Sequence, residues 1–296
     1  MSEPAGRWAL ILHGGAKDIP PAEAEDHRAG LLSCVAAGRA VLAAGGSAID
    51  GVEAAVRALE DNPSFNAGYG SVLNADGEVE TDAAIMDGET LDVGGVAAVQ
   101  GLRHPISVAR LMLYETPTLL AAQGARRWAE AHGAEVCDPA EMIAPRQATD
   151  RGYDTVGCVA LDAAGRIAAG TSTGGLTGKT PGRIGDSPIP GGGLYADSQM
   201  GGVSLSGDGE KIARTLIGYH AFLALQDADP VAAAEQGLAR LARVGGEAGI
   251  IMIDKAGRFG CAHNSTDFAV GAAASWLDCD RAFLRRDEME VLFAHG

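Results

Sequence analysis

Apolar runs separated by short turns rich in Gly and Asp predict two β-hairpins in the second half of the chain. In the first hairpin, the runs Val156–Leu161 and Ile167–Ala169 flank the turn sequence Asp162-Ala163-Ala164-Gly165. The second hairpin spans Gly249 to His263, around the turn Asp254-Lys255-Ala256-Gly257. In each hairpin, the start of the first strand lies beside the end of the second strand.

Longer segments with apolar residues at helical spacing predict helices at residues 22–44, 47–61, 105–115, 118–132, 208–226 and 230–243. Further short apolar runs predict strands at residues 7–12, 93–99, 194–197 and 202–206. Between residues 133 and 154 no period is sustained, so we expect an exposed linker there. The length allows one large α/β unit or two smaller domains.

Net charge narrows the classes of partner. At −16, with no cluster of Lys and Arg, the chain is expected to repel nucleic acid. Hydrophobic residues make up 47% of the sequence, as in ordinary globular proteins.

The five cysteines are scattered without a Cys-x-x-Cys pair, which disfavours disulfides and a zinc site. The apolar run Trp8–Leu12 is too short for a signal peptide or a membrane span, so we expect a cytoplasmic protein.

Hydroxyl side chains gather at one end of the first hairpin, where Thr155 precedes one strand and Thr171-Ser172-Thr173 closes the other. One explanation is a phosphate-binding loop at residues 174–180, GGLTGKT. The Walker spacing, however, needs a glycine at position 173. In addition, Pro181-Gly182 stops the helix that should follow.

A second explanation is a nucleophile elbow at residues 170–174, GTSTG, which fits G-x-S-x-G. That motif requires a sharp turn from a strand into a helix. The residues that follow are rich in Gly and Pro and show no helical period. The pattern also arises easily by chance in a chain with 42 glycines.

The third explanation makes Thr155 an N-terminal nucleophile. A threonine hydroxyl needs a nearby base, and cleavage between Asp154 and Thr155 would free an α-amine in the same residue, with a reference pKa of about 7.7–8.0. As an amide that nitrogen has no available lone pair, so the uncut chain should be inactive. A linker that ends where a buried strand begins suits such cleavage, although a Thr at a strand start is also an ordinary β-former.

Several motifs resemble the plant-type L-asparaginases and isoaspartyl peptidases, which are N-terminal-nucleophile hydrolases of the threonine type. These motifs are LHGGA (12–16), FNAGYGS (65–71), DAAIMDG (82–88), DTVG (154–157), TSTGG (171–175), PGRIGDSP (181–188) and SGDGE (206–210). They occur in the family's order and cover nearly the whole chain. The resemblance therefore favours the third explanation over the other two.

The resemblance implies an α+β fold, a four-layer αββα sandwich of the N-terminal-nucleophile hydrolase type, as a single catalytic domain over residues 1–296. It implies self-cleavage between Asp154 and Thr155 into an α fragment, residues 1–154, and a β fragment, residues 155–296. The implied substrates are the side-chain amide of L-asparagine and the β-peptide bond of isoaspartyl dipeptides. Relatives suggest a homodimer of αβ units, and no cofactor is expected for catalysis.

Catalytic roles follow from the same resemblance. Thr155 is implied as the nucleophile, Thr173 as the hydroxyl that holds it, and Asn66 as a residue that positions active-site groups. Ser206 and Gly207 match the oxyanion-hole pair, one hydroxyl and one backbone N–H. Many relatives carry Thr where this chain has Ser206, so the donor is kept while the methyl group that restrains it is lost.

Substrate binding is implied for Arg183 and Asp186. The guanidinium suits an α-carboxylate, and the carboxylate three residues on suits the α-ammonium. Outside the family context, an Arg-x-x-Asp spacing is more often a surface ion pair.

The segment Leu59–Tyr69 resembles the loop that holds a structural sodium ion in relatives. Hard cations prefer oxygen ligands, and backbone carbonyls would supply them. The carbonyls implied are those of Leu59, Glu60, Asn62, Phe65, Ala67 and Tyr69. A plain turn explains the same sequence.

Other functions stay open at this point. Glycosylasparaginase-like cleavage of the sugar–asparagine amide suits Asp154 and the sequence GDSPIPG (185–191), although TGG (173–175) and FNAG (65–68) fit the asparaginases better. Threonine aspartase is a more distant relative. A non-catalytic amino-acid-binding protein would keep the clamp without turnover. Residues 263–267, HNSTD, depart from the Asn-Thr-Glu-Gly-like run of asparaginases, so the pocket rim is expected to differ.

Overall fold

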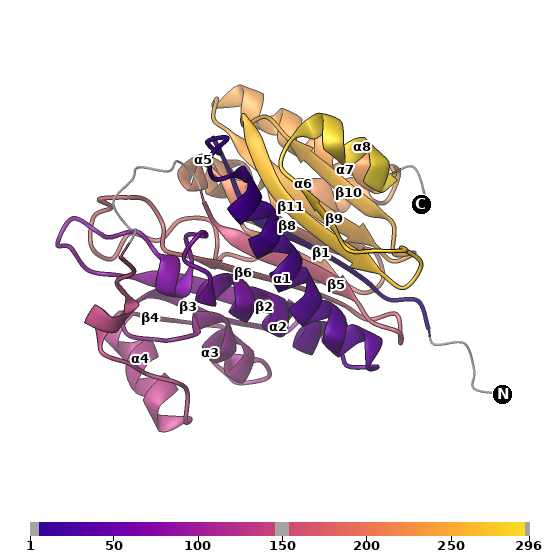
Figure 1. The fold of residues 1–296 in the computed structure, drawn as a ribbon. Helices are drawn as coiled ribbons and strands as arrows, with labels where there is room; N and C mark the ends of the chain where they lie inside the picture. Colours follow the sequence, from indigo (N-terminus) through magenta and orange to yellow (C-terminus); the bar gives the residue numbers. More distant parts are fainter. Residues whose placement is uncertain (1–5, 146–153, 294–296) are drawn as a thin grey trace.

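The computed structural model of the protein describes residues 6–145 and 154–293, with side chains up to Met289. Within these ranges the strands form two sheets (Figure 1). The large sheet has eight strands in the order β12–β11–β1–β5–β6–β2–β3–β4, and the small sheet has four in the order β10–β9–β8–β7. Paired strands are antiparallel except β3 and β4.

The bounds of the elements are as follows. The strands of the large sheet are β1 (Ala9–Lys17), β2 (Thr81–Asp87), β3 (Val93–Val99), β4 (Leu119–Ala121), β5 (Val156–Leu161), β6 (Ile167–Thr173), β11 (Asp267–Ala274) and β12 (Arg281–Phe283). Those of the small sheet are β7 (Leu194–Asp197), β8 (Gly201–Gly207), β9 (Ala248–Asp254) and β10 (Phe259–His263). The helices are α1 (Ala24–Ala43), α2 (Ala48–Asp61), α3 (Pro105–Met112), α4 (Ala122–Ala131), α5 (Gly209–Thr215), α6 (Ile217–Ala224), α7 (Pro230–Ala239) and α8 (Arg286–Phe293).

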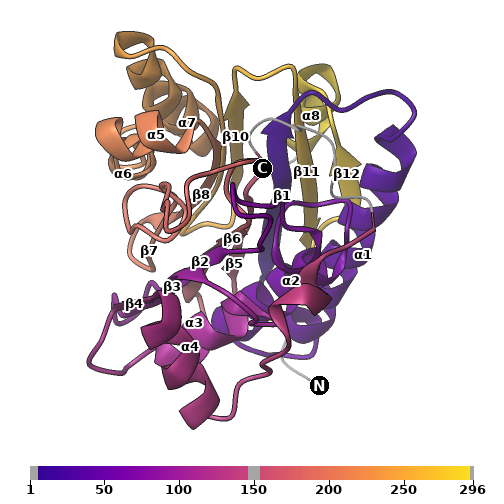
Figure 2. The ribbon, with the colours of Figure 1, turned by 90° about the vertical axis from the view of Figure 1, so that its left-hand side faces the viewer.

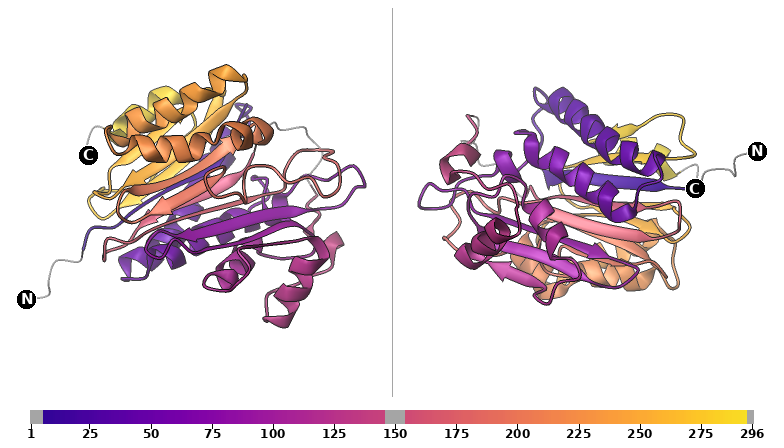
Figure 3. Two further views of the ribbon diagram at one scale, coloured as in Figure 1. Left: turned by 180° about the vertical axis from the view of Figure 1, so that it is seen from behind. Right: turned by 90° about the horizontal axis from the view of Figure 1, so that it is seen from below.

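Apolar side chains alternate between the two faces of the central strands, so both faces of each sheet are covered. On β1, Leu10 and Leu12 belong to the core that includes α1 and α2, whereas Ile11 belongs to the core between the sheets. On β9, Ile251 belongs to that same inner core and Met252 to the core that includes α6 and α7. The two sheets therefore lie between helix pairs, as Figure 2 shows from the side, and α6 and α7 cover the small sheet from behind (Figure 3).

The first predicted hairpin is confirmed and lies in the middle of the large sheet. The N–H of Gly165 donates to the carbonyl of Asp162 at 3.0 Å and closes the turn between β5 and β6. Val156 pairs with Ser172 in this hairpin. Residue 155, immediately before β5, therefore lies beside the last residue of β6, which is Thr173. The pairing of β5 and β6 therefore places the two hydroxyl groups side by side at the same end of these strands.

Several elements differ from the sequence prediction, which gave no strand or helix after residue 263 and so missed β11, β12 and α8. The strand β2 was not predicted, because its sequence contains few β-branched residues and its extended state depends on pairing with β3 and β6. The start of the predicted helix 118–132 is instead the short strand β4, which pairs with β3. The predicted helix 208–226 is two helices, because Leu216 adopts a left-handed conformation with φ of +48°.

The predicted exposed linker is partly wrong. Residues 146–153 lie outside the described residues, but Met142 and Ala144 before them are buried, and Asp154 after them is 3% exposed. A bridge between Leu102 and Val136 also pins the segment after α4 to the body of the protein. Single apolar side chains can be buried without a regular spacing along the chain. The hydrophobic pattern therefore did not indicate that Met142 and Ala144 are buried.

None of the helices in residues 6–145 and 154–293 combines the length and the apolar composition that crossing a lipid bilayer requires.

Candidate active site

Thr155 lies between two other hydroxyl groups. Its Oγ1 donates a hydrogen bond to Thr173 Oγ1 at 3.2 Å and lies 3.0 Å from Ser187 Oγ. Thr155 is 7% exposed and Thr173 3% exposed, so the cluster is nearly closed to solvent. The register of β5 and β6 creates the first contact, and the predicted pairing of these two threonines is observed.

Ser187 was missed by the sequence reasoning. It belongs to the PGRIGDSP motif, from which only Arg183 and Asp186 were assigned a role. Thr171 Oγ1 donates to the carbonyl of Ser187 at 2.6 Å, which fixes this residue against β6. The serine in that motif was the available signal, but only the fold shows that its hydroxyl faces Thr155.

Asn66 lies behind Thr173, to which it is linked through Gly175. Its Nδ2 donates to the carbonyl of Gly175 at 2.7 Å, and its Oδ1 accepts from Val72 N–H at 2.9 Å. The N–H of Gly175 in turn donates to Thr173 Oγ1 at 3.0 Å. A Cβ at Gly174 would lie 2.3 Å from Asn66 Oδ1, so the Gly-Gly sequence is needed for this close approach. Asn66 thus orients the end of β6 without contacting Thr155.

Arg183 and Asp186 converge as predicted, but the guanidinium already has a partner. Arg183 pairs with Glu210 at the start of α5, and the hydrogen bond from Arg183 lowers the pKa of Glu210 below its ordinary value. A Cβ at Gly209 would lie 2.8 Å from Asp186 Oδ1 and 3.0 Å from Arg183 Nη2. Burial raises the pKa of Asp186 to about 7. Glu210 had no predicted role.

Ser206 and Gly207 end β8, directly before α5. Ser206 Oγ accepts a hydrogen bond from Ala16 N–H at 3.1 Å. Gly207 has φ of +151°, and a Cβ there would lie 2.3 Å from the carbonyl oxygen of Glu247, so this position requires glycine. The end of β1 thus joins the predicted oxyanion pair to the predicted cleavage site, because Gly15, next to Ala16, touches Asp154.

Asp154 is buried and paired, which the sequence did not indicate. Lys17 Nζ lies 2.5 Å from Asp154 Oδ2. Gly15 has φ of +108°, and a Cβ on it would lie 2.1 Å from Asp154 Oδ1. Gly15, the second glycine of the HGGA sequence, therefore leaves room for Asp154.

His13 pairs with Gly157 of β5, and its Nε2 lies 3.0 Å from Ser204 Oγ. Complete burial lowers the pKa of His13 to about 3, despite an opposing backbone contact with Thr155. The imidazole is therefore neutral at ordinary pH, and a group with so low a pKa is a poor general base.

The two rejected motifs are structural. Lys179 Nζ is buried and donates to the carbonyl of Glu80 at 2.9 Å, and no helix begins after it in residues 181–193. Ser172 is fully buried within β6 and precedes no helix. Neither a phosphate-binding loop nor a nucleophile elbow is present at these residues.

The loop at residues 59–69 has carbonyl groups turned toward two glycines. A Cβ at Gly68, where φ is +53°, would lie 2.6 Å from the carbonyl oxygen of Glu60. A Cβ at Gly70 would lie 2.0 Å from the carbonyl oxygen of Phe65 and 3.2 Å from that of Asn62. Carbonyl oxygens are ligands that a hard cation prefers. Those of Leu59, Asn62, Phe65 and Ala67 accept the backbone N–H groups of residues 62, 65, 67 and 70, as in a plain turn.

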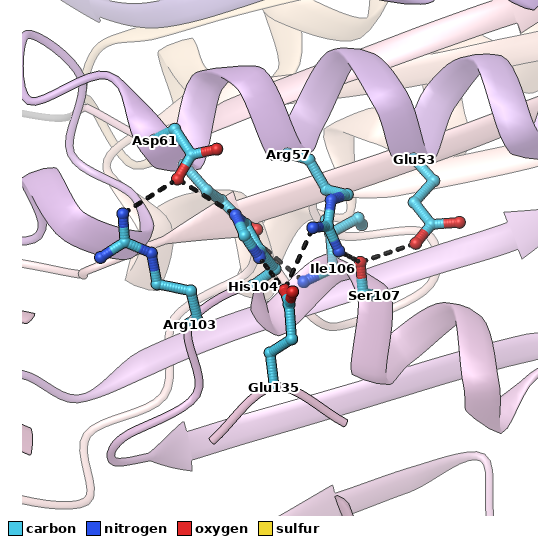
Figure 4. A network of polar contacts seen from close by, with 9 residues as sticks. Glu53, Arg57, Asp61, Arg103, His104, Ile106, Ser107 and Glu135 are labelled. Atoms are coloured by element: carbon cyan, nitrogen blue, oxygen red, sulfur yellow. Dashed lines mark hydrogen bonds and ion pairs between the residues drawn. The ribbon is translucent and has the colours of Figure 1, made fainter. Parts of the chain in front are cut away.

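A second polar cluster joins α2, α3 and the segment after α4 (Figure 4). Arg57 Nη2 donates to Glu135 Oε2 at 3.1 Å, and His104 Nδ1 lies 2.7 Å from the same oxygen. The hydrogen bonds with His104 and Arg57 lower the pKa of Glu135. The cluster lines a cavity of about 470 Å³, but Arg57 is paired with Glu135 and Arg110 with Asp50. We interpret it as the anchor that fixes the segment leading from α4.

Comparison with known proteins places this chain in a family. Residues 6–150 and 143–276 match the asparaginase family. The chain belongs to this family. The resemblance inferred from the motifs is thereby confirmed, and with it the prediction of a hydrolase.

Relatives of this asparaginase-family protein match it over most of their length. The isoaspartyl peptidase/L-asparaginase of Bos taurus is 40% identical over 284 residues, which cover 89% of this chain and 92% of the bovine protein. The protein of the same name from Homo sapiens has the same identity and coverage. That of Xenopus laevis is 37% identical over 305 residues, covering 97% of this chain and 95% of its own.

Proposed function

We propose that this protein is a self-cleaving threonine hydrolase that acts on the side-chain amide of L-asparagine and on the β-peptide bond of isoaspartyl dipeptides. The names of the three relatives support the substrates. The pairing of Thr155 Oγ1 with two hydroxyls, in the residue that follows Asp154, supports the nucleophile most directly. The order of helices, large sheet, small sheet and helices supports the αββα sandwich of N-terminal-nucleophile hydrolases.

The first proposed step is self-cleavage. Thr155 Oγ attacks the carbonyl carbon of Asp154, the C–N bond breaks, the nitrogen takes up a proton, and an ester joins the two residues. Water then hydrolyses the ester and leaves Asp154 with a new carboxylate and Thr155 with a free amine. The low exposure of Thr155 supports an uncut chain that is closed to substrate.

The second proposed step repeats the attack on substrate. The amine of Thr155 takes the proton from its own Oγ, which attacks the side-chain carbonyl carbon of asparagine. Ser206 and the N–H of Gly207 stabilise the oxyanion, with a single donor of this kind typically contributing about 2.7–4 kcal/mol. The amine returns the proton to the departing ammonia, and water hydrolyses the aspartyl ester.

Arg183 and Asp186 are proposed to hold the α-carboxylate and the α-ammonium. Gly175 lies between the clamp and Thr173, since a Cβ there would lie 3.3 Å from Arg183 Nη1. The clamp thus adjoins the nucleophile through a residue without a side chain. Such positioning is a large part of catalysis, because it replaces a bimolecular encounter by a reaction within one complex.

We further propose that the carbonyls of residues 59–69 hold a structural sodium ion when it is bound, with no part in the chemical steps. The pairing of two αβ units into a homodimer and a location in the cytoplasm remain predictions from the sequence.

The function is tested by measuring ammonia and aspartate release from asparagine and from a β-aspartyl dipeptide. We expect both substrates to be hydrolysed by the wild type and by the control Thr118→Ala, which alters an exposed threonine. Thr155→Ala is expected to lose both activities. Binding of asparagine without any turnover by the wild type would instead indicate an amino-acid-binding protein.

A further inference from the structure

Lys17 and Asp154 form a buried ion pair at the residue that precedes Thr155. Lys17 Nζ and Asp154 Oδ2 are 2.5 Å apart, and each side chain is 2% exposed. Gly15, two residues before Lys17, touches the same aspartate from the backbone. The end of β1 therefore encloses Asp154 in a place that water barely reaches.

Asp154 occupies the space next to the nitrogen of Thr155. Asp154 is bonded to the nitrogen of Thr155, which becomes the free amine after cleavage. In the proposed hydrolysis, that amine passes its proton to the nitrogen of the leaving group, so the two nitrogens come within hydrogen-bond reach. The space that Asp154 fills in the uncut chain therefore adjoins the space of the leaving group.

Cleavage changes the surroundings of Lys17. Asp154 becomes the end of the α fragment and is no longer tied to β5, so its carboxylate is free to withdraw. Within the described residues, Asp154 is the sole carboxylate within ion-pair distance of Lys17. Asp267, opposite Lys17 on β11, already accepts from Ile19 N–H at 2.9 Å and pairs with Arg285.

The neighbouring His27 adds no second positive charge beside Lys17. Burial and then the Lys17 ammonium lower the pKa of His27, so its ring stays neutral at pH 7. A buried ammonium whose partner is removed is strongly unfavourable, because the desolvation of the charge is no longer offset. After cleavage, the Lys17 ammonium is therefore a site for an incoming anion.

We propose that Lys17 binds the α-carboxylate of the amino acid that leaves a β-aspartyl dipeptide. This rests on the proposed function and extends it to the acceptor side of the substrate. The leaving residue carries its carboxylate on the carbon next to the reacting nitrogen, whereas asparagine releases ammonia, which has no carboxylate. Lys17 thus favours β-aspartyl dipeptides over asparagine.

The first test uses the wild-type protein and three substrates: β-aspartyl-alanine, the same dipeptide with its C-terminal carboxylate converted to an amide, and asparagine. We expect kcat/KM for the amide to be at least about tenfold below that for the free dipeptide. Equal values for these two would overturn the Lys17 site and leave the proposed function intact. No hydrolysis of any of the three would overturn the proposed function itself.

The second test uses variants of Lys17. The ratio of kcat/KM for the free dipeptide to that for its amide does not depend on how much of the protein is cleaved. We expect Lys17→Met to bring this ratio close to one, Lys17→Arg to keep most of it, and Lys255→Met, an exposed control, to leave it unchanged. A wild-type ratio in Lys17→Met would refute the site. If Lys17→Met yields no active protein, the wild-type and Lys17→Arg ratios decide.

Discussion

Arg183 donates from Nε and Nη2 to the two carboxylate oxygens of Glu210, at 2.8 and 2.7 Å. This pair occupies one edge of the guanidinium and leaves Nη1 beside Gly175, on the side of the threonine cluster. Arg183 has a side chain that is 16% exposed, whereas that of Glu210 is 52% exposed. Glu210 therefore fixes the arginine from the outside, and its other edge is the one proposed to hold the substrate carboxylate.

Loss of this support should weaken substrate binding. We predict that Glu210→Ala raises KM for asparagine by about fivefold, with kcat within about twofold of wild type, since a charge-assisted pair that is half exposed contributes about 1 kcal/mol. Steady-state kinetics with the exposed control Glu235→Ala checks this. A normal KM in Glu210→Ala would show that Arg183 needs no second partner.

Ser187 should act on the rate. Its hydroxyl is 3.0 Å from the Oγ1 of Thr155, the proposed nucleophile. We predict that Ser187→Ala lowers kcat for asparagine by about tenfold, corresponding to one lost hydrogen bond of about 1–1.5 kcal/mol. Ser33→Ala, exposed on α1, is the control. The contribution assigned to Ser187 would be contradicted by an unchanged kcat per cleaved molecule.

Substrate binding should depend on pH through Asp186. Burial raises its pKa to about 7, so this carboxyl is neutral below pH 7 and ionised above it. Its ionised form attracts the substrate ammonium, and we predict that KM for asparagine falls by several-fold as pH rises from 6 to 8. Profiles of KM against pH for the wild type and Asp186→Asn check this. A flat wild-type profile would remove Asp186 from the clamp.

Glu60 should make stability depend on pH. Burial raises its pKa from 4.5 to about 8 in the folded chain, with Oε1 accepting from Ile106 N–H at 3.0 Å. Below pH 4.5 both states bind the proton. Between about pH 4.5 and 8 only the folded state keeps it, so the contribution of Glu60 to the free energy of unfolding falls as pH rises.

Glu60→Gln keeps the hydrogen-bond acceptor and removes the titration. We predict that its free energy of unfolding declines less between pH 5 and 8 than that of the wild type. Denaturant melts at both pH values check this, with the exposed Glu89→Gln expected to follow the wild type. Parallel curves for Glu60→Gln and the wild type would contradict a proton held by Glu60.

Local patterns predicted the parts of the fold that are local in origin. The turn at Asp162–Gly165 and the apolar runs beside it define a hairpin without reference to the remainder of the chain. The strand β2 depends on pairing with β6, which is distant in sequence. The break at Leu216 has a positive φ at a residue that is not glycine, so no turn signal predicted it. The same holds for the linker, because only the folded chain shows that Asp154 is buried.

Some residues of the candidate site could likewise be predicted from the sequence, and others could not. Thr155, Thr173 and Arg183 belong to motifs that could be matched to a family. Lys17 and Glu210 owe their importance to ion pairs between residues 137 and 27 positions apart, which spacing along the chain does not reveal. The role of such a charged residue can be inferred only once the structure shows its ion-pair partner.

The central claim is that the amine exposed on Thr155 activates the oxygen of the same residue. Intact-mass measurement of the purified protein, followed over time together with ammonia release from asparagine, tests it most directly. We predict two fragments, residues 1–154 and 155–296, with activity that rises in proportion to their amount. Thr155→Ala should stay one chain without activity. Full activity from a wild-type chain that remains uncut would contradict the account.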